Sequence, residues 1–300
     1  MQKKAITDTS RESKQKDLSA SLKMTINGTM MGMKEVIPKK SLGQHWLNDG
    51  PTLESICDSA GVTAGDTVLE VGPGLGTLTR KLLNRGAKVV AVEFDTILAA
   101  NLAASLQRDG TISPKYAGNL TVIESDILSF DLTTLPAGYK VVANIPYYLT
   151  SNLIRVLSES ANPFSSAALL IQKEVAERVV AKPGQMSLLS VSAQYYCEAA
   201  LGILVPAKLF TPPPKVDSQV LELRFRENPL FTDVDTKEFF HIVHAGFSQK
   251  RKTLVNSLSA GLSISKDQAR EVLVAAAIDE KARAQSLSLD QWHALYRVLA

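Results

Sequence analysis

The sequence lacks long hydrophobic runs. None of its stretches approaches the roughly 20 consecutive apolar residues that a membrane-spanning helix needs. The first 40 residues contain no apolar core of the kind that a secretory signal has. We therefore expect a cytoplasmic protein that does not interact with a membrane. Its 300 residues, 45% of them hydrophobic, suffice for one large core and a small second one.

Cysteine and histidine are scarce. The two cysteines, Cys57 and Cys197, are far apart in the chain, and neither belongs to a CxxC or Cys/His pattern that would bind zinc. They do not indicate a disulfide framework, so both are expected to be small core residues. The histidines His241, His244 and His293 do not have the spacing of metal ligands. We predict no metal site.

The net charge of +3 is small but unevenly placed. Residues 1–40 contain nine Lys and Arg against four Asp and Glu, so the rest of the chain has a net charge of −2. Residues 1–36 also lack apolar periodicity, and such a segment cannot bury enough surface to offset the entropy of ordering. We predict that they form a disordered basic extension. A basic arm can contact an anionic partner or be a solvated tail, and charge alone favours the tail.

From about residue 50, short apolar runs rich in β-branched residues alternate with segments of helical periodicity. This alternation is typical of parallel strands joined by right-handed helical crossovers. We predict an α/β fold of Rossmann type with a doubly wound, mostly parallel sheet. The expected strands are 67–71, 88–93, 120–124, 139–143 and 167–172, and the expected helices are 53–60, 75–84, 97–107 and 151–158.

Two later apolar runs, 201–205 and 219–225, are expected to finish the sheet with an antiparallel strand. The pattern changes after residue 229, where four amphipathic helices are predicted. We therefore divide the chain into the extension 1–36, an α/β domain 37–229 and a helical domain 230–300. The four helices are expected at 236–247, 252–259, 266–276 and 289–299.

A glycine-rich segment, Glu70-Val71-Gly72-Pro73-Gly74-Leu75-Gly76, follows the first predicted strand. Glycines there permit a sharp turn and let a ligand approach the free amides at a helix N-terminus. The spacing is G-x-G-x-G, because Thr77 stands where a dinucleotide fingerprint has its third glycine. Glu70 would also repel a pyrophosphate, whereas S-adenosylmethionine has a sulfonium and an ammonium but no phosphate.

Carboxylates follow the next two strands. Glu93 ends the second strand, where it can accept hydrogen bonds from both ribose hydroxyls of a nucleoside. Asp126 follows the third strand and can accept from an adenine amino group. Either acid alone would be interpreted as a solvated loop residue. Together with the glycine loop they lie at the edge where doubly wound folds bind ligands, and they predict a site for S-adenosylmethionine.

The fourth strand leads into Asn144-Ile145-Pro146-Tyr147. Adenine N6 is a poor nucleophile because its lone pair is delocalised, so a methyltransferase must draw this lone pair out of the ring plane. The Asn144 side-chain oxygen and a backbone carbonyl of Ile145 or Pro146 can accept the N6 hydrogens, and Pro146 fixes the backbone. Tyr147 can stack on the extruded base. Alone, the segment would be an Asn-x-Pro turn; after such a glycine loop, it indicates adenine methylation.

Five segments resemble the small-subunit ribosomal RNA adenine N6,N6-dimethyltransferases of KsgA type, and the resemblance extends from about Lys39 to the C-terminus. It implies a class I S-adenosylmethionine-dependent methyltransferase that dimethylates two adjacent adenosines in a hairpin loop near the 3′ end of the small-subunit RNA. The implied partners are this RNA and the precursor of the small subunit, and we expect a monomer. The five segments are 41–49, 70–74, 144–147, 172–175 and 210–218.

The resemblance also assigns residues. A basic run, Lys250-Arg251-Lys252, resembles the family's helix junction and would contact RNA phosphates without reading sequence; a solvated helix start is the alternative. His45 replaces the family's usual Asn, and an imidazole can donate or accept one hydrogen bond where an amide does both. Phe210 would form the second aromatic wall of the base pocket, opposite Tyr147. Cofactor contacts would fall on His45, Leu47, Gly72, Glu93, Asp126 and Asn144.

Two other functions are compatible with the sequence. A related enzyme that methylates one adenine of large-subunit RNA and confers antibiotic resistance would share the sheet and the site. The helical domain and the prolines 212–214 favour the small-subunit enzyme. A non-catalytic assembly or transcription factor could keep the fold, but it would not need all five of the residues Glu93, Asp126, Asn144, Pro146 and Tyr147.

Overall fold

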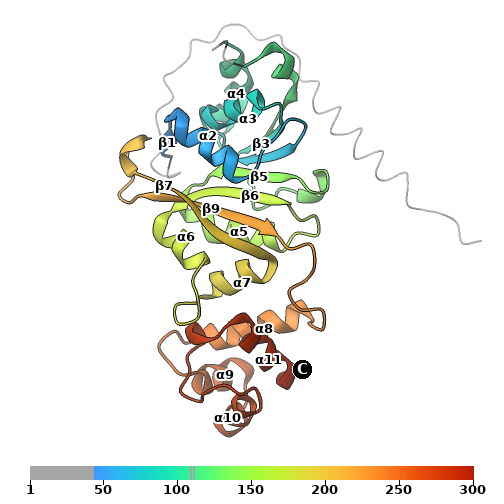
Figure 1. Cartoon of the computed structure of the whole chain (residues 1–300), viewed down its shortest axis with the longest axis vertical. Helices are drawn as coiled ribbons and strands as arrows, with labels where there is room; N and C mark the ends of the chain where they lie inside the picture. The colour runs from blue at the N-terminus through green and yellow to red at the C-terminus, as the bar shows by residue number, and fades with distance from the viewer. Residues whose placement is uncertain (1–43, 109, 111) are drawn as a thin grey trace, which may run out of the picture. The chain divides into compact units, whose positions relative to one another are not determined.

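The computed structural model describes residues 44–108, 110 and 112–300 (Figure 1). The predicted extension 1–36 and the start of the segment 41–49 lie outside these residues. Within the described residues, no helix is both long and apolar enough to cross a membrane.

A seven-stranded sheet organises the α/β part of the chain. Its strands are β2 (Thr67–Val71), β3 (Lys88–Glu93), β4 (Leu120–Glu124), β5 (Lys140–Asn144), β6 (Ser166–Gln172), β7 (Cys197–Val205) and β9 (Ser218–Phe225). They lie in the order β4-β3-β2-β5-β6-β9-β7. Strands β2 to β6 pair in parallel, and β9 is antiparallel to both β6 and β7. The predicted doubly wound, mostly parallel sheet is confirmed.

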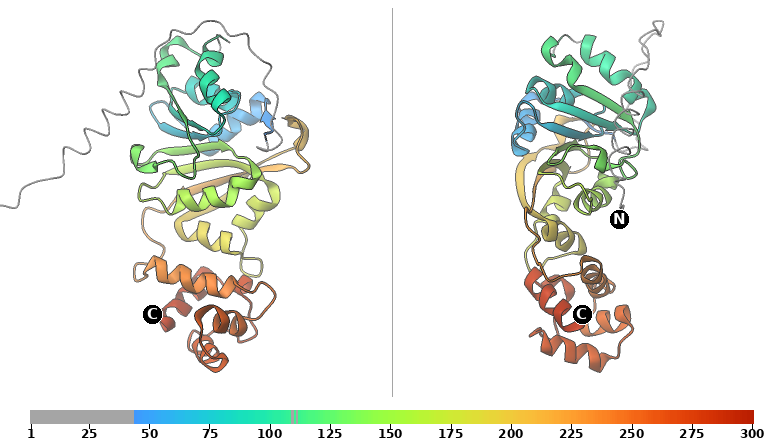
Figure 2. Two further views of the ribbon diagram at one scale, coloured as in Figure 1. Left: turned by 180° about the vertical axis from the view of Figure 1, so that it is seen from behind. Right: turned by 90° about the vertical axis from the view of Figure 1, so that its right-hand side faces the viewer.

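Helices cover both faces of this sheet (Figure 2). One face packs against α2 (Gly50–Ser59), α3 (Thr77–Asn84) and α4 (Thr96–Arg108), and the other against α5 (Thr150–Ser158), α6 (Lys173–Val179) and α7 (Leu188–Tyr196). Successive side chains of a strand point to opposite faces, so Val68 and Leu69 enter different hydrophobic clusters. Because both faces are buried, the central strands are almost continuously apolar.

The sequence pattern predicts no helix between residues 172 and 201, but α6 and α7 lie there. Helix α7 has the sequence LLSVSAQYY and is buried on several sides, so it has no polar stripe from which helical periodicity could be recognised. Its start is fixed by a capping box, in which Ser187 and Ser190 satisfy each other's backbone amides. The helix therefore depends on this cap and on tertiary packing.

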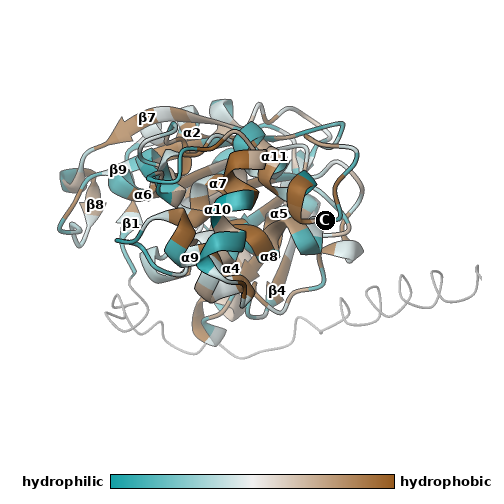
Figure 3. Ribbon diagram, turned by 90° about the horizontal axis from the view of Figure 1, so that it is seen from below, coloured by the Kyte–Doolittle hydropathy of each residue, from teal (hydrophilic) through white to brown (hydrophobic). Residues whose placement is uncertain are grey.

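Four further helices follow the sheet: α8 (Thr236–Phe247), α9 (Leu254–Leu262), α10 (Lys266–Ala275) and α11 (Leu289–Leu299). Their existence agrees with the sequence analysis, although α9 begins two residues later than expected. Each carries both polar and apolar residues, as the colours of Figure 3 show. Their shared core includes Phe239 and Trp292, and it also contains Met186, Val191 and Tyr195 from the region of α7. Helix α7 thus belongs to the packing of both parts.

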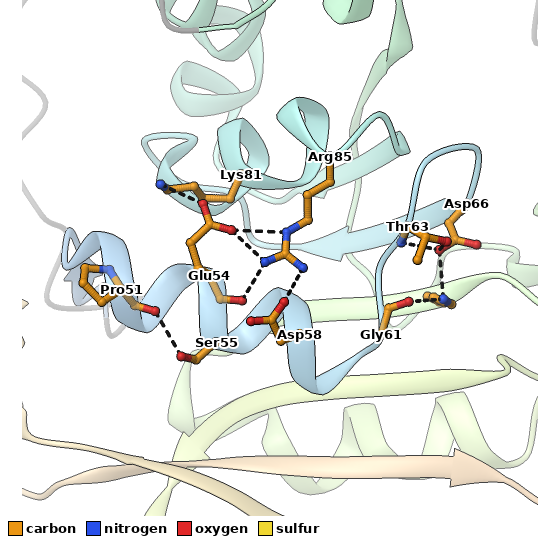
Figure 4. Close-up of polar contacts among 10 residues, drawn as sticks. Pro51, Glu54, Ser55, Asp58, Gly61, Thr63, Asp66, Lys81 and Arg85 are labelled. Carbon is orange, nitrogen blue, oxygen red and sulfur yellow. Dashed lines mark hydrogen bonds and ion pairs between the residues drawn. The ribbon is translucent and has the colours of Figure 1, made fainter.

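An ion-pair network joins α2 to α3 (Figure 4). The Arg85 guanidinium lies 2.7 Å from a carboxylate oxygen of Glu54 and 2.7 Å from one of Asp58, and Lys81 lies 2.9 Å from Glu54. Hydrogen bonding from Arg85 is the main cause that holds the pKa of Glu54 below its usual range. Helix α2 follows residues 44–49 and α3 follows the glycine loop. The network therefore holds these two segments in place relative to each other.

Candidate active site

A cavity of about 280 Å³ lies where β2, β3, β4 and β5 end. Ligands of doubly wound folds bind at this edge. The cavity brings together all nine residues that the sequence analysis assigned to the cofactor and the base, although they come from separate parts of the chain. They are His45, Leu47, Gly72, Glu93, Asp126, Asn144, Pro146, Tyr147 and Phe210.

The glycine loop forms one wall of the cavity. Gly72, Gly74 and Gly76 all have positive φ, at 65°, 56° and 79°, which L side chains rarely adopt. Space matters as well, because a Cβ on Gly76 would lie 2.8 Å from Leu102. Thr77, at the position of the missing third glycine, donates its hydroxyl to the Leu47 carbonyl at 2.9 Å. This bond ties the start of α3 to the segment that carries His45.

Glu93 is locked against the glycine loop. One carboxylate oxygen accepts from the Gly74 amide at 3.1 Å, and the other accepts from the Asp95 amide at 2.9 Å. Burial is the main cause that raises the pKa of Glu93. Each oxygen keeps a second lone pair, so the group can accept further hydrogen bonds from a ligand in the cavity.

Asp126 and Glu70 differ in their surroundings. Asp126 is exposed, and its side chain accepts from the Leu128 amide at 2.9 Å, which orients it beside the cavity. Glu70 is 1% exposed, and neither of its oxygens has a hydrogen-bond partner among the described residues. Burial raises the pKa of Glu70 to about 8. Because burial favours the neutral carboxyl, repulsion by Glu70 does not by itself exclude a pyrophosphate from the ligand-free protein; the missing third glycine remains.

Asn144 ends β5 with its amide held in one orientation. Its Nδ2 donates to the His45 carbonyl at 3.1 Å, so its Oδ1 points away from that contact. This oxygen has no hydrogen-bond partner among residues 44–108 and 112–300 and is a free acceptor at the cavity. The next residues form a tight turn, in which the Leu149 amide donates to the Pro146 carbonyl at 2.9 Å.

Aromatic and imidazole rings form the wall next to Asn144. The Tyr147 hydroxyl lies 3.0 Å from Ser218 Oγ, and its ring stacks on His45 with centroids 6.0 Å apart and planes 25° apart. His45 Nδ1 lies 2.7 Å from the Pro212 carbonyl, and because a carbonyl only accepts, this nitrogen carries the hydrogen. Phe210 is buried in the same cavity.

A two-stranded pairing that the sequence analysis did not predict brings Phe210 to this place. Strand β1 (Trp46–Leu47) pairs antiparallel with β8 (Phe210–Thr211), so that Leu47 lies opposite Phe210. Two aromatic residues are among the lining residues that were missed: Phe94, directly after Glu93, and Tyr148, directly after Tyr147. Their only signal in the sequence is adjacency to a predicted site residue.

The basic run lies apart from the residues that line the cavity. Lys250, Arg251 and Lys252 occupy the turn between α8 and α9, and all three are exposed. None of them forms an ion pair with another described residue. They are free to contact an anionic partner.

Comparisons with known proteins agree with this geometry. Residues 37–300 match the family model described as Ribosomal RNA adenine dimethylase. The chain is 39% identical over 262 residues to Ribosomal RNA small subunit methyltransferase A of Dehalococcoides mccartyi (strain CBDB1), which covers 86% of this chain and 87% of the relative. It is 41% identical over 276 residues to the protein of that name from Shouchella clausii (strain KSM-K16), covering 87% and 90%.

Two solved structures are similar over most of their length. The 23S rRNA methyltransferase ErmE has a TM-score of 0.67 and 28% identity, covering 85% of this chain and 99% of ErmE. A dimethyladenosine transferase from Plasmodium falciparum has a TM-score of 0.69 and 29% identity, covering 84% and 96%. The chain therefore belongs to the ribosomal RNA adenine dimethylase family.

Proposed function

We propose that the protein transfers methyl groups from S-adenosylmethionine to N6 of two adjacent adenosines in a hairpin loop near the 3′ end of small-subunit ribosomal RNA. The observation that carries this proposal is the free Asn144 oxygen beside Tyr147 and Phe210 in a cavity that also contains Glu93. This reaction needs a hydrogen-bond acceptor for the amino group, aromatic rings for the base and a carboxylate for the ribose. The reaction would take place in the cytoplasm, on the precursor of the small subunit, with the protein as a monomer.

The residues present suit S-adenosylmethionine. Glu93 would hold the ribose hydroxyls, Gly72 would let the methionine part approach the backbone, and Asp126 would accept from the adenine amino group. His45, Leu47 and Asn144 complete the lining on the opposite side. When bound, the cofactor supplies an electrophilic methyl group.

The chain's own residues would then prepare the target adenine. Tyr147 and Phe210 hold the base, and Asn144 Oδ1 accepts from one N6 hydrogen, which favours the out-of-plane lone pair. Pro146 already shares its carbonyl with Leu149, so the Ile145 carbonyl is the better second acceptor. No base is needed before attack, since methylation itself makes the N6 proton acidic. Alignment of donor and acceptor supplies most of the acceleration.

The proposal favours the small-subunit substrate over large-subunit RNA. The relatives at 39% and 41% identity bear a small-subunit name, whereas the 23S rRNA methyltransferase is 28% identical. A purely non-catalytic role would leave the orientation of Asn144 without purpose. We also propose that residues 37–229 form a cofactor-binding catalytic domain and that residues 230–300 form an RNA-binding helical domain.

Mass analysis of small-subunit RNA tests the function. Small subunits with unmodified RNA should gain two adjacent N6,N6-dimethyladenosines in their 3′ fragment when incubated with the protein and S-adenosylmethionine. Methylation of large-subunit RNA alone would favour the runner-up enzyme. No methylation of either RNA would favour an assembly factor.

Glu93→Ala should weaken S-adenosylmethionine binding by about 1.5–3 kcal/mol, the range for hydrogen bonds to a charged group. Titration calorimetry measures this change. Glu124→Ala is a matched control, because Glu124 lies opposite Glu93 in the register of β3 and β4. Glu124 is exposed, accepts a hydrogen bond from the Thr96 hydroxyl and does not line the cavity. Equal dissociation constants for Glu93→Ala and the wild type would remove Glu93 from the site.

Neutralising Lys250, Arg251 and Lys252 together should flatten the salt dependence of RNA binding. Each lost phosphate contact should reduce the log-log slope by about 0.7 to 0.9, because fewer counterions are released. A matched triple variant would neutralise Lys88, Arg108 and Lys115, which lie at or before the N-terminal ends of β3 and β4. This control variant should keep the wild-type slope. If the variant at Lys250, Arg251 and Lys252 keeps it as well, the basic run is only a solvated surface.

A further inference from the structure

Exposed aromatic side chains are confined to the mouth of the cavity. Of all Phe, Tyr and Trp side chains in the described residues, only Phe94 and Tyr148 are exposed, at 61% and 65%. Both line this cavity. Large exposed rings gathered at one opening indicate a surface that a flat ligand covers.

The two rings differ in their neighbours. Phe94 directly follows Glu93 at the end of β3, on the side where the cofactor's nucleoside is expected. Tyr148 directly follows Tyr147, the residue that would stack on the target base. The Tyr148 ring has no ring contact and no hydrogen bond with any described residue and is 65% exposed, so most of its surface is available to a ligand.

The backbone presents Tyr148 in a fixed position. The turn Tyr147–Leu149 is closed by the Leu149 amide donating to Pro146 and by the Thr150 amide donating to Tyr147. Tyr147 is directed inward by its hydrogen bond with Ser218. A ring held on a fixed turn loses little conformational entropy when a ligand stacks on it.

We propose that Tyr148 is the binding surface for the nucleobase next to the adenosine that occupies the cavity. The inference rests on the proposed function, in which the substrate has two adjacent adenosines. When one base enters the cavity, the phosphodiester linkage keeps its neighbour at the mouth, where an unstacked purine needs a new partner. Stacking on an aromatic side chain provides it.

Such a surface would serve both halves of the reaction. Dimethylation removes the N6 hydrogens of adenine but leaves its π face, so a stacking partner still accepts the modified base. A hydrogen-bonding subsite would reject it. A stacking partner therefore accepts the neighbouring base whether it is unmodified or dimethylated.

A double substitution cycle between protein and RNA tests the proposal. Small subunits would be reconstituted from unmodified RNA, with either two adenosines or one adenosine and an abasic neighbour. Methylation of the remaining adenosine would be measured with wild type, Tyr148→Ala and Tyr148→Phe at saturating S-adenosylmethionine. On intact RNA, Tyr148→Ala should raise the half-saturating subunit concentration about tenfold with the maximal rate within about twofold. Tyr148→Phe, which keeps the ring, should behave like wild type.

On the abasic RNA, wild type and Tyr148→Ala should have the same half-saturating concentration, because the partner base is already missing. A tenfold loss that persists on abasic RNA, or no loss on intact RNA, would overturn the proposal. A higher dissociation constant of Tyr148→Ala for S-adenosylmethionine alone would also overturn it, because that result would assign the ring to the cofactor. If wild type methylates neither substrate, the proposed function fails, and this inference fails with it.

Discussion

Asn144→Ala is expected to slow methyl transfer by roughly 10²–10³, while RNA affinity stays within a few-fold. The Asn144 amide donates to the His45 carbonyl at 3.1 Å, which leaves Oδ1 as the free acceptor beside the base wall. Its contact with N6 should strengthen as charge develops on the nitrogen, so its loss appears in turnover more than in binding. Single-turnover rates on small subunits at saturating S-adenosylmethionine measure the effect.

Asn162→Ala is a suitable control for this experiment. Its amide donates to the carbonyls of Leu132 and Leu135, at 2.9 Å each, and it does not line the cavity. Removing it should lower stability by about 1 kcal/mol per lost hydrogen bond and leave the rate of methyl transfer unchanged. If Asn144→Ala turns over at the wild-type rate, Asn144 is only a turn residue and the mechanism must be abandoned.

The strands of the parallel sheet could be predicted because burial on both faces makes them continuous apolar runs. The sequence prediction places the strands 67–71, 88–93 and 120–124 with the bounds that the structure has. Strand β1 could not be found in this way. It has two residues, and its pairing with Phe210 and Thr211 joins segments more than 160 positions apart. No local pattern encodes such a contact.

The candidate site was predictable to the extent that topology determines it. Parallel strands end at one edge of a sheet. The proximity of Gly72, Glu93, Asp126 and Asn144 could therefore be predicted without knowing any side-chain contact. Exposure and protonation state depend on the whole fold. The exposed ring of Tyr148 and the raised pKa of Glu70 therefore had no signal in the sequence.

Glu70 leads to a prediction about stability and pH. Its pKa is about 8 in the ligand-free fold, against an ordinary value of 4.5, because burial penalises the charged form. A carboxyl whose pKa is higher in the folded chain than in the unfolded chain contributes fully to stability below about pH 4.5. The contribution is lost as the pH rises through about 8, since the unfolded chain has already released a proton that the folded chain still holds.

Glu70→Gln should remove this pH dependence, because the amide keeps the shape of the side chain but does not titrate. Between pH 5 and pH 8.5, the free energy of unfolding of the variant should rise relative to wild type by several kcal/mol, on the order of 4. Urea unfolding of the ligand-free proteins at three pH values measures the difference. Glu227→Gln, on an exposed residue, should show a constant difference from wild type over the same range. Parallel pH curves for Glu70→Gln and wild type would mean that Glu70 is ionised in the folded protein, and the cavity would then carry the negative charge that the sequence analysis first assigned to it.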